Sequence, residues 1–200
     1  MLIALLGGEI GAGKTTVCQQ VVNLARERGF VCGGLLTPAL VENGHKVGII
    51  GADLSNGERR VLARTDRDLG GSRVGCYHFT ADAFDWANAL IASTVAAGCD
   101  LLAVDEIGPL ELEHGGGLAP ALNLIAAAPR ALIVVRLSLV DVLRDRLKRV
   151  GRASLSDHTI KVFLTTASSR DRLPDEVAGW LFGLTEYLPH HARPVGPSNR

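Results

Sequence analysis

Short apolar runs alternate with longer amphipathic segments along most of the chain. Residues 2–6 are wholly apolar and end at glycines, a pattern typical of a strand that is buried on both faces of a parallel sheet. Residues 15–28 place apolar side chains at helical spacing, and Gly29 follows them as a C-terminal cap. The N-terminal segment therefore predicts a strand, a glycine-rich loop and a helix.

The same alternation resumes after residue 80 and continues to residue 187. Buried strands are predicted at residues 101–104, 131–135 and 160–164. Amphipathic helices are predicted at residues 81–97, 117–128, 139–149 and 170–187. This alternation favours an α/β fold, a three-layer sandwich whose central sheet is mostly parallel.

Residues 31–79 interrupt the alternation. The pairs Asn43-Gly44 and Asn56-Gly57 are strong turn signals, and they border strand-like segments at residues 46–54 and 59–64. We therefore expect a β-rich insertion of antiparallel hairpins.

The two ends of this insertion are predicted to be strands as well. One strand is expected at residues 31–37 and the other at residues 73–79. The polar, glycine-containing stretch at residues 65–72 is expected to form a mobile loop between them.

Length and composition favour one domain. The 200 residues suffice for one well-buried domain, and 47% of them are apolar. We expect that domain at residues 1–187. Residues 188–200 hold three prolines among polar residues, so a disordered tail with solvated His190 and His191 is expected there.

The charge balance and the N terminus limit the partners. The chain has 21 basic and 21 acidic residues, so no broad basic field is available for nucleic acid. The apolar opening lacks the basic region of a signal peptide, and no stretch is long enough to span a membrane. We expect a soluble, cytoplasmic monomer with neither nucleic acid nor membrane as a partner.

The cysteines give no sign of a metal site. Cys18, Cys32, Cys76 and Cys99 form no C-x-x-C pair and stand beside no histidine at ligand spacing. They are predicted to be small buried side chains in a reducing compartment.

Residues 8–15 match the phosphate-loop pattern G-x-x-x-x-G-K-[ST] without departure. Its glycines allow unusual backbone angles and let N–H groups approach phosphate oxygens, which the following helix N terminus also attracts. Lys14 would add a positive charge at the β- and γ-phosphates, and Thr15 would offer a hydroxyl to Mg²⁺. The predicted nucleoside-triphosphate-binding residues are Gly8, Glu9, Ile10, Gly11, Ala12, Gly13, Lys14, Thr15 and Thr16.

A second acidic site is predicted where the strand at residues 101–104 ends. Asp105 is the candidate Mg²⁺ ligand, directly or through water. Glu106 stands one position further and is the candidate base that orients and deprotonates the attacking water.

An arginine could stabilise the charge that develops on the transferring phosphoryl group. Arg136 and Arg170 are favoured because they stand at a strand end and before a helix, on the expected edge of the site. The other candidates, in and after the basic helix, are Arg144, Arg149 and Arg152.

The segment Val-Asp-Glu-Ile-Gly-Pro-Leu-Glu-Leu at residues 104–112 resembles the D-E-I-G-P-[ML]-E-L signature of the small nucleoside triphosphatases. This family includes thermophilic ATPase/GTPases and a human cancer-related nucleoside triphosphatase. The resemblance runs in the family's order from residue 1 to about residue 185. Further similar stretches are Gly33–Pro38, Lys46–Ile49, Gly75–Tyr77 and Ser169–Pro174.

The resemblance implies an α/β P-loop fold with a β-hairpin insertion, and Mg²⁺-dependent hydrolysis of nucleoside triphosphates with broad base tolerance. It implies that Lys14 and Thr15 bind the phosphates and Mg²⁺, that Asp105 binds Mg²⁺, and that Glu106 activates the attacking water. Two positions depart from the family pattern. Ser169 stands where the family usually has asparagine, and Lys46 replaces an arginine and so loses its forked geometry.

The residues alone leave two other functions open. A P-loop kinase would use Glu106 or a neighbouring residue to activate a hydroxyl of a small molecule, with residues 65–72 as a lid. A nucleotide-binding accessory protein for cofactor assembly would also open with a strand, a glycine-rich loop and Gly-Lys-Thr-Thr, but would scarcely turn nucleotide over alone.

Overall fold

The computed structural model describes residues 1–125, 127–150 and 159–183 of the chain. The predictions for the tail, for the last residues of the final helix and for Arg152 concern residues outside these ranges.

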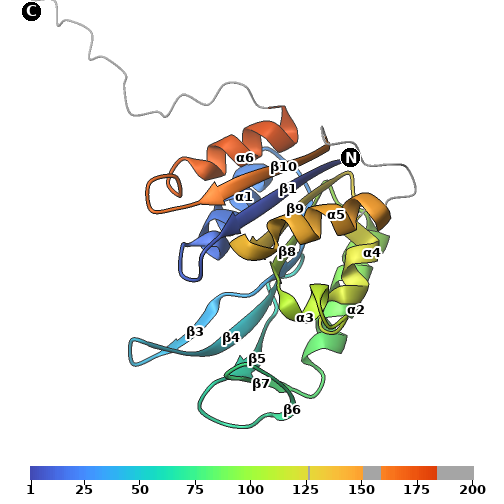
Figure 1. Ribbon diagram of the computed structural model, residues 1–200. Coiled ribbons are helices and arrows are strands. Elements are labelled where there is room, and N and C mark those ends of the chain that lie inside the picture. Colours follow the sequence, from blue (N-terminus) through green and yellow to red (C-terminus); the bar gives the residue numbers. More distant parts are fainter. Residues whose placement is uncertain (126, 151–158, 184–200) are drawn as a thin grey trace, which may run out of the picture.

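Five parallel strands form one part of a single sheet (Figure 1). They stand in the order β10, β1, β9, β8, β2, so that two strands separate β1 from β2. The α/β class and the parallel centre of the sheet are therefore confirmed. The bounds are β1 (Leu2–Gly8), β2 (Cys32–Leu36), β8 (Leu101–Ile107), β9 (Arg130–Arg136) and β10 (Ile160–Thr165).

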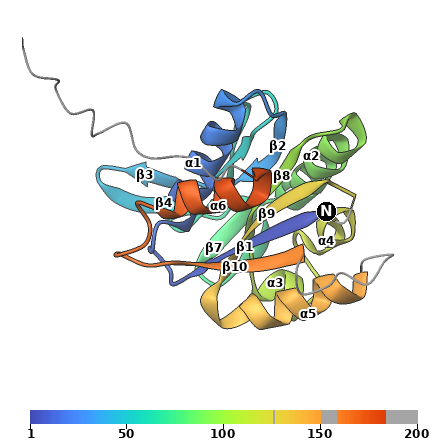
Figure 2. The same ribbon diagram turned by 90° about the horizontal axis from the view of Figure 1, so that it is seen from above.

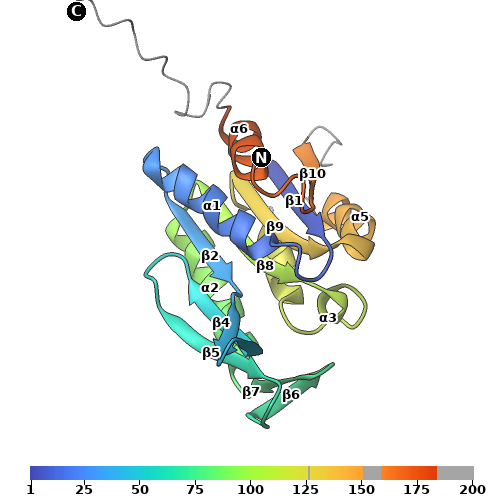
Figure 3. The ribbon, with the colours of Figure 1, turned by 90° about the vertical axis from the view of Figure 1, so that its left-hand side faces the viewer.

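The sheet continues beyond β2 with antiparallel strands (Figure 3). The order from β2 outward is β4, β5, β7, β6, and β3 pairs with β4 away from this path. The strand β2 itself, which we expected at the start of the insertion, pairs in parallel with β8. The bounds are β3 (Ala39–Glu42), β4 (His45–Asp53), β5 (Arg59–Arg64), β6 (Gly70–Val74) and β7 (Tyr77–Thr80).

Helices cover both faces of the parallel part. Figure 2 shows α1 and α6 on one side of these strands and α5 on the other. One apolar cluster joins the sheet to α2, α4 and α5, and a second joins it to α1 and α6. The main helices are α1 (Lys14–Glu27), α2 (Ala83–Ala97), α4 (Leu122–Ile125), α5 (Val140–Val150) and α6 (Leu173–Phe182).

The strand β1 illustrates why helices must cover both faces of the sheet. Its side chains alternate, so Ile3 and Leu5 enter the cluster with α2, α4 and α5, while Ala4 and Leu6 enter the cluster with α1 and α6. All four are completely buried. A continuous apolar run of this kind is stable only where helices lie on both sides of the sheet.

The prediction for residues 65–79 was wrong in detail. We expected a loop and then one strand, whereas the structure has a hairpin of β6 and β7 that turns at Gly75 and Cys76. Gly75 has a φ of 60°, a left-handed conformation that glycine adopts without strain. The antiparallel part also contains β3, which we did not predict.

Two helix predictions were too long. Residues 117–128 were expected to be one helix, but the chain forms the 3-10 turn η1 (Ala119–Ala121) and then the single turn α4. Pro120 stands at the start of η1 and has no backbone N–H to give. The last helix begins at Leu173, not near residue 170, because residues 166–172 form a hydrogen-bonded turn.

A further single turn, α3 (Pro109–Leu112), was not predicted and follows β8 directly. The short 3-10 turn η2 (Leu137–Leu139) similarly leads from β9 into α5.

The expectation of four buried cysteines holds only in part. Cys18 and Cys32 are buried and Cys99 is partly buried, but Cys76 is exposed in the turn between β6 and β7. Within the described residues, no helix combines the length and the apolar character needed to cross a membrane.

Candidate active site

The phosphate loop joins the end of β1 to the start of α1. Gly11 and Gly13 have φ values of 79° and 95°, which an L side chain rarely adopts. Gly13 caps α1 without a side-chain hydrogen bond, and the first turn of α1 carries no acidic residue. The N terminus of α1 therefore offers free N–H groups and a positive dipole end to an anion.

Strand register places two neighbours beside Gly8. It pairs with Arg136 of β9 on one side and with Thr165 of β10 on the other. A side-chain carbon at Gly8 would lie 2.8 Å from the carbonyl oxygen of Thr165, which is too close. Only glycine therefore fits where the strand enters the loop.

Lys14 is buried and folds back over the loop. Its Nζ donates hydrogen bonds to the carbonyl oxygens of Gly8, at 3.0 Å, and Glu9, at 2.9 Å. The same Nζ lies 3.8 Å from Oε1 of Glu106. The cation is thus held at the centre of the loop, where phosphate oxygens can exchange with the two carbonyls as its partners.

Asp105 is completely buried near the C-terminal end of β8. Its Oδ2 accepts a hydrogen bond from the backbone N–H of Thr37, at 3.1 Å. Its Oδ1 has no hydrogen-bond partner within the described residues. Burial raises the pKa of Asp105 to about 6, against the opposing effects of the Thr37 N–H and the Thr15 side chain.

Glu106 lies next along β8, where the pairing with β9 shifts between Val104 and Ile107. Its side chain is half-buried, and Oε1 lies 3.8 Å from Nζ of Lys14 and 3.9 Å from Nε of Arg136. This oxygen makes no hydrogen bond within the described residues. Two cations therefore flank the carboxylate beside the phosphate loop, and its buried Oε1 accepts no hydrogen bond from the described residues.

Glu111 fixes the loop that follows β8, a role we did not assign from the sequence. Its carboxylate accepts hydrogen bonds from the backbone N–H groups of Gly108, at 2.8 Å, and Leu118, at 3.1 Å. Burial raises the pKa of Glu111, partly offset by these two hydrogen bonds. The signal was present in the second glutamate of the D-E-I-G-P-L-E-L stretch, but only the fold reveals the two N–H groups that it holds.

The arginine candidates fall into two groups. Arg136 lies at the site beside Glu106, and Arg170 lies beside the loop, with its Cδ 3.9 Å from where a side chain on Gly13 would begin. Arg144 instead pairs with Asp141 of its own helix at 2.7 Å. Arg149 lines a separate small hollow away from the phosphate loop.

The two departures from the family pattern have different environments. The hydroxyl of Ser169 donates to the carbonyl oxygen of Leu164 at 2.7 Å and accepts from the N–H of Thr166 at 3.0 Å, so it stabilises its own loop. Lys46 lies on the antiparallel part, with its Nζ 5.4 Å from the ring centre of Tyr77.

A strand, a glycine-rich loop and a helix N terminus, with a buried aspartate and a freely accepting glutamate alongside, define a P-loop nucleotide-binding protein. Residues 4–178 match the model of the family described as NTPase. The chain belongs to this NTPase family.

Relatives of known name agree with this assignment. The nucleoside-triphosphatase THEP1 of Methanopyrus kandleri is 33% identical over 178 residues, which cover 83% of this chain and 97% of the relative. The protein of the same name from Pyrobaculum aerophilum is 34% identical over 140 residues, covering 68% of this chain and 75% of the relative.

A solved structure shares the fold. The solution structure of a human cancer-related nucleoside triphosphatase superposes with a TM-score of 0.68 at 23% identity, covering 93% of this chain and 100% of that one. This likeness supports the α/β arrangement with a mostly parallel sheet.

Proposed function

We propose that the protein is a nucleoside triphosphatase that hydrolyses the γ-phosphate of ATP, GTP and other nucleoside triphosphates, giving the diphosphate and inorganic phosphate. The observation that carries this proposal is the position of Glu106 Oε1, which lies 3.8 Å from Nζ of Lys14 in the phosphate loop and 3.9 Å from Nε of Arg136 and accepts no hydrogen bond from the described residues. We further assign the chain to the three-layer P-loop class, with its antiparallel strands as an insertion.

The residues present fit a Mg²⁺ ion. Mg²⁺ prefers hard oxygen ligands, and Asp105 offers a buried Oδ1 without a hydrogen-bond partner in the described part of the chain. The Thr15 side chain is close enough to lower the pKa of Asp105. The Thr15 hydroxyl and the Asp105 carboxylate could therefore offer oxygen ligands to the same Mg²⁺ ion. When bound, Mg²⁺ would neutralise charge on the β- and γ-phosphates.

The chain's own residues account for the remaining steps. Phosphate oxygens take the place of the Gly8 and Glu9 carbonyls as partners of Lys14. Glu106 accepts a proton from the attacking water as the water oxygen bonds to the γ-phosphorus. The bond from that phosphorus to the bridging β–γ oxygen breaks, and the diphosphate leaves with this oxygen while Arg136 stabilises the charge on the phosphoryl group.

The test is the variant Glu106→Gln, which keeps the shape of the side chain and removes the base. We expect phosphate release from Mg·ATP to fall about 10²- to 10⁴-fold, the usual contribution of a positioned base. Nucleotide affinity should stay within about threefold, because the phosphate loop is intact. The matched control is Glu113→Gln, an exposed carboxylate in the same segment, which should behave as wild type.

The assay also separates the alternatives. Inorganic phosphate released by the chain alone, without an added acceptor, excludes a strict kinase and an accessory protein that needs a partner for turnover. A Glu106→Gln variant that hydrolyses at the wild-type rate would show that Glu106 is not the base.

A further inference from the structure

Glu106 stands where β8 loses its regular pairing with the neighbouring strands. Between Val104 and Ile107, β8 has two residues where β9 has only one. In the described part of the chain, the pairing of β8 with β2 ends at Val104. A bulge of this kind leaves a residue without a ladder partner and re-aims the side chains around it. The position of Glu106 therefore depends on what holds the chain immediately after it.

The carboxylate of Glu111 holds this following segment from the inside. Its Oε2 accepts a hydrogen bond from the N–H of Gly108 at 2.8 Å, and its Oε1 accepts one from the N–H of Leu118 at 3.1 Å. The side chain is only 5% exposed. Glu111 thus clamps together the two ends of the loop at residues 108–118, and the first of these ends lies two residues after Glu106.

Both oxygens of Glu111 are needed as acceptors. A glutamine would keep the shape of the side chain but would turn an NH₂ group toward one of the two buried N–H donors. A side chain at Gly117 would begin too close to Oε1, so only glycine leaves room for the carboxylate. Burial raises the pKa of Glu111, and the charge of Glu106 adds to this increase. The two N–H groups offset this cost of a second carboxylate near Glu106.

The clamped loop is also anchored to two helices. Nη1 of Arg146 on α5 donates a hydrogen bond to the carbonyl oxygen of Glu111 at 3.1 Å. Nδ2 of Asn88 on α2 donates one to the carbonyl oxygen of Gly117 at 2.9 Å. Both helices pack on the sheet in the same apolar cluster. The clamp therefore ties the end of β8 to a frame that is itself fixed on the sheet.

We infer that Glu111 is a positioning residue for hydrolysis, which keeps the Glu106 carboxylate beside Lys14 and Arg136 by holding the chain that follows it. This inference rests on the proposed function, because Glu111 acts only through Glu106. A displacement of a reacting group by about 1 Å can slow a reaction about 10²-fold. Nucleotide binding does not depend on the clamp, because the phosphate loop follows β1 and not β8.

The experiment measures steady-state phosphate release from Mg·ATP by Glu111→Gln and by wild type. We expect kcat to fall about 10- to 10²-fold while KM stays within about twofold. Glu113→Gln, an exposed carboxylate in the same segment, is the matched control and should behave as wild type. Leu62→Ala on β5 controls for a merely structural effect, and it should lower stability without lowering kcat.

A double-mutant cycle with Glu106→Gln tests whether Glu111 acts through Glu106. Once the base is removed its position no longer matters, so adding Glu111→Gln to Glu106→Gln should change the rate by less than about twofold. If Glu111→Gln does not fold, the same cycle is run with Asn88→Ala. That variant removes one anchor of the loop and should lower kcat about threefold with KM unchanged.

Backbone amide NMR gives a reading that does not depend on hydrolysis. The signals of Glu106 and Ile107 should shift in Glu111→Gln and should stay in place in Glu113→Gln. Unchanged signals in Glu111→Gln would show that the clamp does not set the position of Glu106.

Two kinetic results would also overturn the inference. One is a wild-type kcat in folded Glu111→Gln. The other is a full additional loss when Glu111→Gln is combined with Glu106→Gln, which would show that Glu111 acts elsewhere. A wild-type rate in Glu106→Gln alone would instead refute the proposed base, and the NMR signals would still decide whether Glu111 holds Glu106 in place.

Discussion

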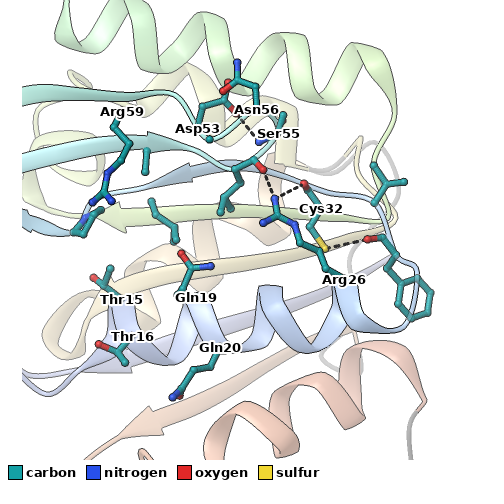
Figure 4. Close-up of a pocket in the computed structure, with 17 residues that line it drawn as sticks. Thr15, Thr16, Gln19, Gln20, Arg26, Cys32, Asp53, Ser55, Asn56 and Arg59 are labelled. Atoms are coloured by element: carbon teal, nitrogen blue, oxygen red, sulfur yellow. Dashed lines mark hydrogen bonds between the residues drawn. The ribbon is translucent and has the colours of Figure 1, made fainter.

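The parallel and antiparallel parts of the sheet are built differently. Residues of β1, β8 and β9 are almost all buried, and helices lie on both faces. The strands β3 and β6 are largely exposed along their length. Every group proposed for hydrolysis lies on the parallel part or on the loops and helix that follow it, whereas the antiparallel part lines one wall of a groove whose other wall is α1 (Figure 4).

This difference has a physical basis. Parallel strands end together at one edge, so groups that follow β1, β8 and β9 meet there without any long loop. A buried frame also holds those groups at fixed distances, which phosphoryl transfer requires. The antiparallel hairpins bury less, so substitutions on their exposed faces should cost little stability.

The largest effect should come from Lys14→Met. The change keeps the length of the side chain and removes the cation from the centre of the phosphate loop. We expect phosphate release to fall about 10³-fold, together with a large loss of nucleotide affinity. Steady-state phosphate release and calorimetric binding of Mg·ATP would measure both. Activity near that of wild type would break the link between the parallel part and catalysis.

Matched leucine substitutions compare the stability of the two parts. Leu132 on β9 is completely buried in the cluster with α1 and α6, whereas Leu62 on β5 is buried but belongs to neither main cluster. Leu132→Ala should lower the free energy of unfolding by about 3–4 kcal/mol, and Leu62→Ala by about 2 kcal/mol. Urea denaturation measures both, and equal costs would contradict the contrast.

The raised pKa of Asp105 makes stability depend on pH. Below the ordinary pKa both states of the chain are protonated, and the group has no effect. As the pH rises toward about 6 the unfolded chain loses this proton first, so the folded state loses relative stability. The loss amounts to at most about 3 kcal/mol, because the pKa shift is about two pH units. Asp105→Asn should remove it.

The measurement is urea denaturation of both proteins in EDTA at several pH values between 4 and 7. Wild type should lose stability relative to Asp105→Asn as the pH rises. Parallel pH profiles would show that the carboxyl is not held neutral by burial. Added Mg²⁺ should stabilise wild type at pH 7 more than the variant, because only wild type offers the carboxylate.

The smallest effect should come from the two arginines at the site. Arg136 is half-exposed, so solvent screens its charge, and Arg136→Met should reduce phosphate release only about tenfold. Arg170→Met should reduce it less, about threefold, because Arg170 lies beside the loop and not beside Glu106. Single-turnover rates of Mg·ATP hydrolysis by the two variants measure both effects. A larger loss in Arg170→Met than in Arg136→Met would place the terminal phosphate on the β10 side.

The strands of the parallel part could be predicted because a strand buried on both faces has a continuous apolar run, as residues 2–6 have. The antiparallel part was harder. Its side chains are partly exposed on both faces, so the alternation is weak, and the turn at Gly75 was read as the middle of a strand. Short turns such as α3 and η1 depend on local proline and tertiary contacts, which periodicity does not reveal.

The sequence by itself determined the phosphate loop, since glycine spacing, Lys14 and Thr15 act through local backbone geometry. It also placed Asp105 and Glu106 directly after a buried strand at residues 101–104, whereas β8 continues through both of them to Ile107. Only the tertiary structure decided which arginine meets Glu106, what Glu111 holds, and that Arg59 faces a groove while Arg60 does not. Those contacts join residues far apart in the chain, and they are set by strand order and register, which local sequence does not encode.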